Sequence, residues 1–218
     1  MTRIVITLFL LAASPAFAAE AVPSAAPPQS QESALFQVFL SPTPDTHSVM
    51  YEVKKGDNLT AIAKAHRVTT GLIQKVNGLP DDRLNVGKKL KIPTYKISLL
   101  VDKSDNTLQL KGDGELLKTY VVATGKNNST PVGVFKVTDK LVNPTWYKAG
   151  AVVPPGSTDN QLGSRWLGLT AKGYGIHGTI EPDKLGQQVT AGCVRMKNEE
   201  VEELYSLVPP GTEVTIQD

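Results

Sequence analysis

Glycine and proline recur along the whole of this 218-residue chain, with 18 glycines and 15 prolines. Glycine costs backbone entropy inside a helix, and proline lacks the N–H group that a helix needs. Their abundance therefore favours strands, turns and a linker over a helical bundle. The composition, 40% hydrophobic and 20% charged, is that of a globular protein long enough for one medium and one small domain. A net charge of +2 points to no class of partner.

The first eighteen residues have the pattern of a secretory signal peptide. Arg3 supplies the positive charge, residues 4–13 form the apolar core, and Ala16-Phe17-Ala18 is a cleavage site of the A-x-A type. The apolar core is too short to span a bilayer comfortably, so we expect cleavage, with an uncleaved membrane anchor as the alternative. No cysteine follows the core, which argues against a lipoprotein. We expect an exported protein of the periplasm or cell wall, with no stable membrane insertion.

Residues 19–49 are rich in alanine, proline, serine and glutamine. Such a segment buries too little apolar surface to order itself, which predicts an extended linker. The apolar patch Leu35-Phe36-Gln37-Val38-Phe39-Leu40 interrupts it. This patch has the character to pack on one of the domains, and the sequence does not indicate which one.

Residues 50–94 have the pattern of a compact strand–helix–helix–strand unit. After a strand at 51–53, Asp57 or Asn58 is placed to cap a helix that keeps apolar residues at helical spacing. Thr69 or Thr70 begins a second helix, and Asn77-Gly78 ends it. With a strand at 90–92, two antiparallel strands are expected to cover a layer of two helices.

This unit resembles a LysM domain over its whole length. The matching residues are Tyr51, Val53, Gly56, Asp57, Leu59, Ile62 and Ala63, followed by Asn77-Gly78-Leu79, Leu84, Gly87, Leu90 and Ile92-Pro93. The resemblance implies a shallow groove for the N-acetylated sugars of peptidoglycan or chitin, between the loop before the first helix and the loop after the second. The residues that would line it are Gly56, Asp57, Asn58, Leu59, Leu79, Pro80 and Asp81. For Asp57, a role as helix cap is an equal alternative.

The same unit is basic, with nine lysines or arginines and four acidic residues between positions 50 and 95. An excess of positive charge suits an anionic cell wall, and a solvated basic face is the alternative.

From residue 96 to 217 the pattern changes to short β segments, at 96–102, 107–111, 118–123 and 133–138. Glycine, proline and asparagine turns separate them, which predicts an antiparallel sheet or sandwich. One helix is expected, with Asn198 as its cap and Pro209-Pro210-Gly211 at its end, before a closing strand at 213–216. The predicted fold class is thus a mainly β, sandwich-like domain with one helix in its C-terminal region, after a small α+β domain.

Cys193 is the only cysteine of the chain. An unpaired thiol in an oxidising compartment is a liability unless it is buried or used, and a buried structural cysteine is the alternative. Its neighbours in the sequence favour a reactive thiol. Gly192 leaves room for a substrate carbonyl, and His177 lies on a strand-like stretch sixteen positions earlier. A thiol of ordinary pKa, about 8.5, needs a nearby imidazole or cation to become a thiolate at neutral pH. We therefore predict Cys193 as a nucleophile and His177 as its general base.

Together, His177-Gly178-Thr179 and Thr190-Ala191-Gly192-Cys193-Val194-Arg195 resemble the signature of the L,D-transpeptidases of the YkuD family. Further matches are Thr130-Pro131-x-Gly133-x-Phe135, Asn143-Pro144-Thr145-Trp146 and residues 162–169, and the likeness covers most of 96–217. It implies that Cys193 attacks the carbonyl at the L-centre of a stem-peptide diamino acid and releases the D-residue beyond it. A side-chain amine of a neighbouring stem then resolves the thioester.

The resemblance also implies roles for the surrounding residues. The backbone carbonyl of Gly178 would orient His177, and amides around Gly192 and Cys193 would form the oxyanion hole. Thr190 would keep the hydroxyl of the serine that is common in the family and contribute to substrate binding.

Arg195 would favour the thiolate or hold a substrate carboxylate, while a simple ion pair with Glu199 or Glu200 is the alternative. Trp146 and Trp166 are expected to be packing residues. No cofactor or metal is expected, since three scattered histidines and one cysteine do not make a zinc site.

The sequence does not decide which acceptor resolves the thioester. Water would make the protein an L,D-carboxypeptidase, and a lipoprotein lysine would make it a lipoprotein-anchoring transpeptidase. A non-catalytic wall-binding protein is the alternative from another class. The expected partners are peptidoglycan stem peptides and glycan strands, with no nucleic acid and an open oligomeric state.

Overall fold

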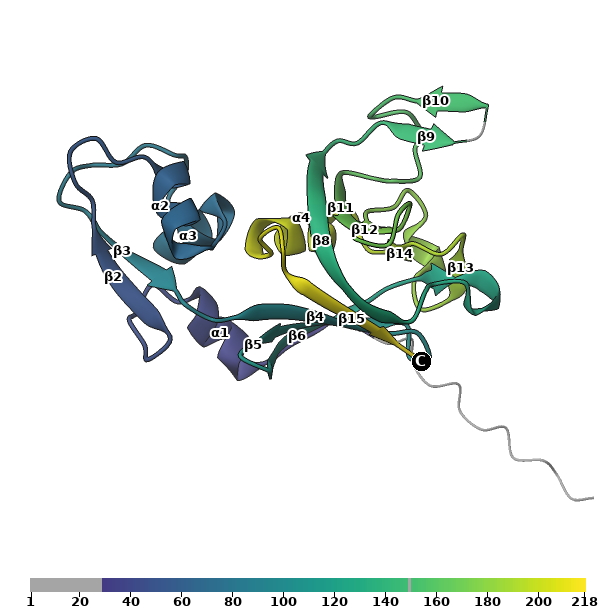
Figure 1. Cartoon of the computed structure of the whole chain (residues 1–218), viewed down its shortest axis with the longest axis horizontal. Coiled ribbons are helices and arrows are strands. Elements are labelled where there is room, and N and C mark those ends of the chain that lie inside the picture. Colours follow the sequence, from purple (N-terminus) through teal and green to yellow (C-terminus); the bar gives the residue numbers. More distant parts are fainter. Residues whose placement is uncertain (1–28, 149) are drawn as a thin grey trace, which may run out of the picture.

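The computed structural model describes residues 29–148 and 150–218, and the predicted signal peptide lies outside these residues. A small module (residues 48–93) and a large domain (residues 97–217) lie side by side (Figure 1). The segment before the small module adds residues 31–32 to the sheet of the large domain as strand β1. None of the helices in the described ranges has the length and apolar character needed to cross a membrane.

The small module has the predicted strand–helix–helix–strand order. Strand β2 (Ser48–Glu52) pairs antiparallel with β3 (Lys89–Pro93). Helix α2 (Leu59–His66) begins after Asn58, whose side chain accepts a hydrogen bond from the Ala61 amide at 2.8 Å. Helix α3 (Thr70–Asn77) begins after Thr69 and ends at Gly78, which has a left-handed backbone. Both predicted helices are confirmed, because their capping residues are local signals.

The large domain is built on one nine-stranded sheet in the order β1-β6-β5-β4-β15-β8-β11-β12-β14. Its strands are β1 (Gln31–Glu32), β4 (Ile97–Asp102), β5 (Thr107–Gly112), β6 (Glu115–Val121), β8 (Gly133–Val142), β11 (Arg165–Leu169), β12 (Gly175–His177), β14 (Val194–Arg195) and β15 (Glu213–Gln217). The sheet curls around helix α4 (Asn198–Leu207), which packs on it through Val201, Leu204 and Leu207 (Figure 1). The mainly β fold class is confirmed. The sheet is mixed rather than antiparallel, because β15 runs parallel to β4 and β14 runs parallel to β12.

Shorter elements surround this sheet. Strands β7 (Thr124–Gly125) and β13 (Gln188–Thr190) form a parallel pair. Strands β9 (Trp146–Lys148) and β10 (Ala151–Val153) form a hairpin that projects from the large domain (Figure 1). Two 3-10 turns, η1 (Lys126–Asn128) and η2 (Pro182–Lys184), complete the domain.

The prediction of an extended linker is wrong for its second part. Gln31 and Glu32 form the edge strand β1, which pairs with β6, and helix α1 (Ala34–Leu40) follows, capped by Ser33. Phe36 and Phe39 are almost fully buried in a core cluster that includes Leu72 of α3 as well as strands of the large domain. The apolar patch therefore packs against both parts of the chain, and burial rather than local composition orders it.

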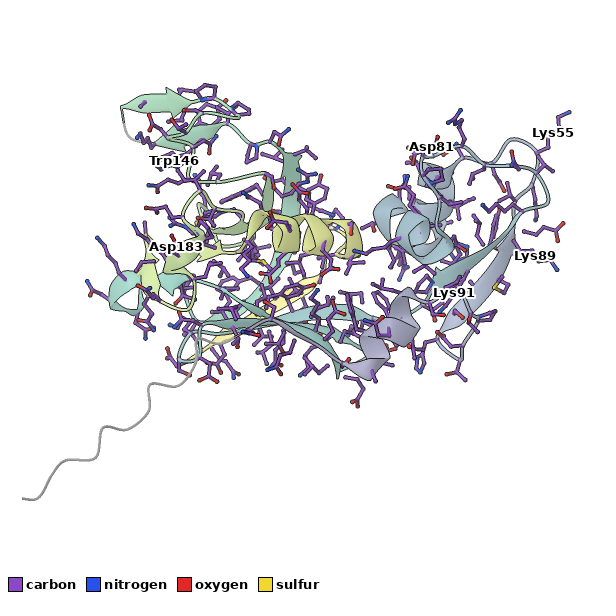
Figure 2. The ribbon with its side chains drawn as sticks, turned by 180° about the vertical axis from the view of Figure 1, so that it is seen from behind. Lys55, Asp81, Lys89, Lys91, Trp146 and Asp183 are labelled. Atoms are coloured by element: carbon purple, nitrogen blue, oxygen red, sulfur yellow. The ribbon has the colours of Figure 1, made fainter. Side chains whose placement is uncertain are left out.

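A buried lysine joins the segment after α1 to the small module. The ammonium group of Lys91 on β3 contacts the Asp45 carboxylate at 2.7 Å and the carbonyl oxygens of Ser41 at 2.8 Å and Val38 at 3.1 Å (Figure 2). Each of these partners compensates part of the cost of burying the charge.

Helices α3 and α4 form the direct contact between the two parts. Thr69 donates a hydrogen bond to the Ser206 carbonyl, and Lys75 pairs with Glu203 at 3.0 Å. Glu203 also binds Lys118 of β6 at 2.6 Å. Apolar packing and paired charges thus fix the small module on the large domain.

Candidate active site

The predicted nucleophile and base lie at one edge of the large sheet. Strands β12 and β14 are parallel, with Ile176 beside Val194 and His177 beside Arg195. Cys193 directly precedes β14 and is next to Gly175, whose backbone N–H faces its sulfur. Because side chains alternate along strands, Cys193 and His177 project from the same face as diagonal neighbours. The indole of Trp166 fills the space over Gly175, where a Cβ would lie 2.5 Å from it.

His177 is a buried, neutral imidazole, with 4% of its surface exposed. Burial lowers its pKa to about 4; the carbonyl of Gly178 opposes this shift, and the charge of Arg195 adds to it. Nδ1 lies 2.7 Å from the Gly178 carbonyl oxygen, which can only accept, so Nδ1 carries the proton. Nε2 is then the basic nitrogen. The indole of Trp166 stacks on the ring, with centroids 5.8 Å apart.

Cys193 is a half-buried thiol. Burial raises its pKa, which the Gly175 N–H and the charge of Arg195 lower only in part. The sulfur lies 3.8 Å from the Gly173 carbonyl oxygen, and within residues 29–148 and 150–218 no hydrogen bond joins it to the ring of His177. The resting site therefore holds a neutral thiol and a neutral imidazole.

The turn before Cys193 depends on Thr190 and Gly192. The Thr190 hydroxyl donates to the Cys193 carbonyl at 2.7 Å and accepts the Gly192 N–H at 3.1 Å. Gly192 has φ of 130°, and a Cβ there would lie 2.6 Å from the ring of Tyr174. Thr190 is thus engaged in shaping the turn. Since the Gly192 amide is occupied, the amide of Cys193 is the better oxyanion donor of the two predicted.

Arg195 is buried and paired with a residue that the sequence reasoning missed. Its guanidinium contacts Glu181 at 2.8 Å rather than the suggested Glu199 or Glu200, and 6% of its surface is exposed. Glu181 comes from the loop after His177, and no periodic pattern marks it. Nε of Arg195 is buried without a hydrogen-bond partner in the described part of the chain.

Asn198 does not cap α4, contrary to the prediction; the cap position is Lys197, without a side-chain bond. The Asn198 side chain instead accepts the N–H groups of Ser164 at 3.1 Å and Thr179 at 3.2 Å, and donates to the Thr179 carbonyl at 2.8 Å. A Cβ on Gly178 would lie 2.1 Å from its oxygen. Asn198 therefore holds the turn that presents the Gly178 carbonyl to His177.

A pocket of about 320 Å³ opens over Cys193. Its other lining residues are mostly apolar or aromatic and include Leu141, Trp146, Tyr147, Leu162 and Trp166. The two tryptophans, expected only to pack, thus line this pocket. Trp166 is directly opposite His177 in the β11–β12 register, and a Cβ on Gly175 would lie 2.5 Å from its indole. The Gly175-x-His177 spacing next to a predicted strand is the signal that could have revealed it.

The residues predicted to bind sugar have mixed surroundings in the small module. Leu59 and Leu79 belong to its core, and Asn58 caps α2. The Asp57 carboxylate accepts hydrogen bonds from the Tyr51 hydroxyl and the Lys54 amide, each at 2.8 Å. Gly56 lies in the turn before α2 with φ of 93°, and Pro80 is exposed after α3. The structure thus gives fold-related contacts to Asp57, Asn58, Leu59 and Leu79.

Two family models match the chain. The LysM domain covers residues 51–93, and the L,D-transpeptidase catalytic domain, YkuD, covers residues 96–216. The chain belongs to the L,D-transpeptidase family. Both resemblances noted in the sequence are confirmed, and the large domain is the catalytic domain of this L,D-transpeptidase.

Relatives of this L,D-transpeptidase support the assignment. It is 35% identical over 173 residues to the putative L,D-transpeptidase YkuD of Bacillus subtilis, covering 76% of this chain and 97% of the relative. It is 44% identical over 126 residues to YqjB of the same organism, covering 55% and 70%. The fold is similar to that of L,D-transpeptidase 3 from Mycobacterium tuberculosis, with a TM-score of 0.50, 15% identity and coverage of 79% and 92%.

Proposed function

We propose that this L,D-transpeptidase cross-links peptidoglycan stem peptides through a thioester on Cys193. The observation that carries the proposal is the arrangement of Cys193, directly before β14 and lining an open pocket, and His177 on the adjacent strand β12, with the Gly178 carbonyl 2.7 Å from Nδ1 of the imidazole. Family membership supplies the reaction class.

In the first half-reaction, the sulfur of Cys193 forms a bond to the donor carbonyl carbon while its proton passes to Nε2 of His177. Transfer accompanies attack, since both groups start neutral. The carbonyl electron pair moves to oxygen, and the Cys193 N–H faces the resulting oxyanion. The carbon–nitrogen bond then breaks, and the departing amine takes the proton from His177. A thioester and a free D-residue remain.

In the second half-reaction, a side-chain amine of a neighbouring stem attacks the thioester. It gives a proton to His177, a new amide forms, and the sulfur leaves and regains that proton. The low pKa of His177 makes its protonated form more acidic than an ordinary imidazolium, which favours return of the proton at each collapse. Arg195, buried beside both groups, contributes positive charge that lowers the pKa of the thiol.

Location and anchoring complete the proposal. The signal-like N-terminus supports export to the periplasm or cell wall. The small module, matched as a LysM domain, binds the glycan strand. We place the contact at Gly56, Asp57, Asn58 and Pro80; the predicted Leu59 and Leu79 are buried in the core and are not part of it.

Incubation of the mature protein with a purified disaccharide-tetrapeptide, followed by mass spectrometry, tests the function. Cross-linked dimer supports transpeptidation, tripeptide alone supports a carboxypeptidase, and unchanged substrate supports a binding protein. Cys193→Ala should abolish turnover and leave the melting temperature and glycan binding as in the parent. Turnover that persists in this variant would exclude Cys193 as the nucleophile.

A further inference from the structure

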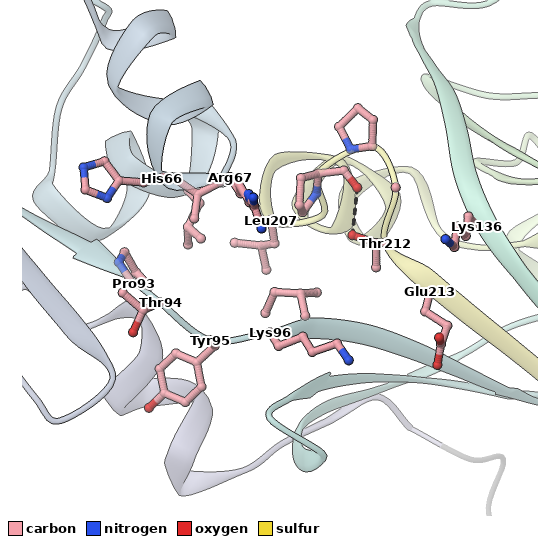
Figure 3. Close-up of a pocket in the computed structure, with 16 residues that line it drawn as sticks. His66, Arg67, Pro93, Thr94, Tyr95, Lys96, Lys136, Leu207, Thr212 and Glu213 are labelled. Atoms are coloured by element: carbon pink, nitrogen blue, oxygen red, sulfur yellow. Dashed lines mark hydrogen bonds between the residues drawn. The ribbon is translucent and has the colours of Figure 1, made fainter.

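A second hollow lies between the small module and the large domain. This cleft of about 550 Å³ is bounded by the end of α2 on one side and by the starts of β4 and β15 on the other (Figure 3). No residue lines both the cleft and the pocket over Cys193. Cavities of this size at domain junctions are frequent ligand sites.

Apart from one carboxylate, the charged groups that line the cleft are cationic. Arg67, Lys96 and Lys136 come from the small module, the start of β4 and β8, and their side chains border the hollow (Figure 3). None of the three has an ion-pair partner within the described ranges. The lining contains one carboxylate, Glu213, which faces Lys136 across β15 and β8. The lining therefore carries a net positive charge, and we take Arg67 and Lys96, which the β8–β15 register does not place opposite Glu213, as the charges available to a ligand.

The backbone at Arg67 is a second, independent observation. Arg67 ends α2 in a left-handed conformation, with φ of 57° and ψ of 34°. The same position at the end of α3 is Gly78, with φ of 60°. A residue with a Cβ is disfavoured in this conformation, and such strain concentrates where a side chain is needed. The small module has arginine where its other helix has glycine, and that arginine borders the cleft.

We propose that the cleft binds the carboxylates of a peptidoglycan stem peptide. This rests on the proposed function, which makes stem peptides the substrate. Arg67 and Lys96 match the carboxylates in charge, and the partly exposed apolar lining from Val68, Ile97 and Pro209 suits short aliphatic side chains.

The reach of a stem peptide is compatible with this site. Helix α2 has eight residues and is about 12 Å long, with the predicted sugar loop at its start and Arg67 at its end. An extended tetrapeptide spans about 14 Å. A peptide carried by a glycan at that loop is therefore long enough to reach the cleft.

Binding to the full chain with Cys193→Ala, in which no turnover is expected, tests the proposal. Calorimetry compares a disaccharide-tetrapeptide with the same disaccharide lacking its peptide. The test variant adds Arg67→Gln and Lys96→Gln. The matched control adds Lys89→Gln (Figure 2) and Lys126→Gln, which remove one exposed lysine from each part of the chain outside the cleft.

The test variant should bind the disaccharide-tetrapeptide roughly five- to tenfold more weakly, with more salt reducing the difference. Its affinity for the peptide-free disaccharide, and both affinities of the control, should match the parent. Three outcomes would each overturn the proposal. The test variant binds the disaccharide-tetrapeptide as tightly as the parent does, it loses the same affinity for the peptide-free disaccharide, or the parent binds neither ligand.

Two further measurements separate a binding role of Arg67 from a folding role, and the binding proposal from the transpeptidase proposal. Arg67→Gly removes the guanidinium and relieves the backbone strain, so binding should weaken while the melting temperature stays equal or rises. A fall in melting temperature would instead show that Arg67 serves folding. Formation of cross-linked dimer is measured with the protein that retains Cys193. If no dimer forms while the difference in binding persists, the transpeptidase proposal is refuted and the binding proposal is not.

Discussion

Burial sets the chemistry of His177 and Cys193 at the residue scale. It lowers the pKa of the imidazole and raises that of the thiol, so neither group is charged before substrate arrives. The hydrogen bond to Gly178 fixes which ring nitrogen is basic. The reactive state is therefore created during attack rather than stored in the resting protein.

The pKa of His177 also predicts a pH-dependent stability. The unfolded chain binds a proton at this residue near pH 6.5, whereas the folded chain does so at about 4. The stabilisation is therefore complete above pH 6.5 and is lost as pH falls toward 4. It amounts to roughly 3 kcal/mol. Denaturant titrations at several pH values should show this slope, and His177→Gln should flatten it. An unchanged slope in the variant would contradict a buried neutral His177.

Asn198 should act as a positioning residue. Asn198→Ala leaves the amides of Ser164 and Thr179 without their acceptor and loosens the Gly178 turn. We expect kcat to fall about 10- to 100-fold with little change in KM, because a small misplacement of a catalytic group is costly. Asn198→Asp keeps the acceptor and should restore part of kcat. A kcat in the alanine variant equal to that of the parent would exclude the role.

Cys193, His177 and the contact of His177 with Gly178 could be predicted from the sequence, because each belongs to a continuous motif or to neighbouring residues. The sequence was insufficient for Arg195 and Asn198. Their partners, Glu181 and Thr179, are 14 and 19 positions away and come close only when β12 and β14 pair.

At the scale of elements, local signals decide what sequence reasoning finds. Helices α2 and α3 have an Asn or Thr cap and a clear end, and both were predicted with their capping residues. Helix α1 was missed because proline- and serine-rich sequence surrounds it and its phenylalanines are buried by distant strands. The β segments were predicted at the right places, but β8 extends to Val142, since pairing with β11 continues beyond its alternating stretch.

The contact between α3 and α4 can be tested at Gly71. In an isolated helix, Gly→Ala stabilises by about 1 kcal/mol. Here a Cβ would lie 3.0 Å from Ser206 Cβ and 3.1 Å from its carbonyl oxygen. Gly71→Ala should therefore destabilise the protein, by about 1–3 kcal/mol, measured by denaturant unfolding. A more stable variant would show that the two helices separate easily.

At the scale of the molecule, one core cluster joins both parts of the chain. It contains Phe36 and Phe39 of α1, Leu72 and Val76 of α3, and the apolar face of α4. The small module also has a core of its own. We expect the whole chain to unfold as one unit, because the shared cluster couples the two cores.

Phe39→Ala should remove this coupling. The side chain is fully buried and packs edge-on against Tyr95, with ring centroids 5.3 Å apart. The loss should cost roughly 3–5 kcal/mol. Both tryptophans, Trp146 and Trp166, are in the large domain, so their fluorescence reports that domain while circular dichroism also reports α2 and α3. The two probes should coincide in the parent and separate in the variant. Coincident curves in Phe39→Ala would contradict the coupling.

The packing of α3 against α4, which holds the small module in one orientation on the large domain, has a consequence for how the cell wall is built. If the module moved freely on a tether, an enzyme held at one sugar would sample every peptide within a sphere around it. With the module immobile, the orientation of the anchored strand also orients the thiol. New bonds would then form at a constant offset from the anchoring sugar, so the spacing of cross-links along a strand would reflect the dimensions of the enzyme.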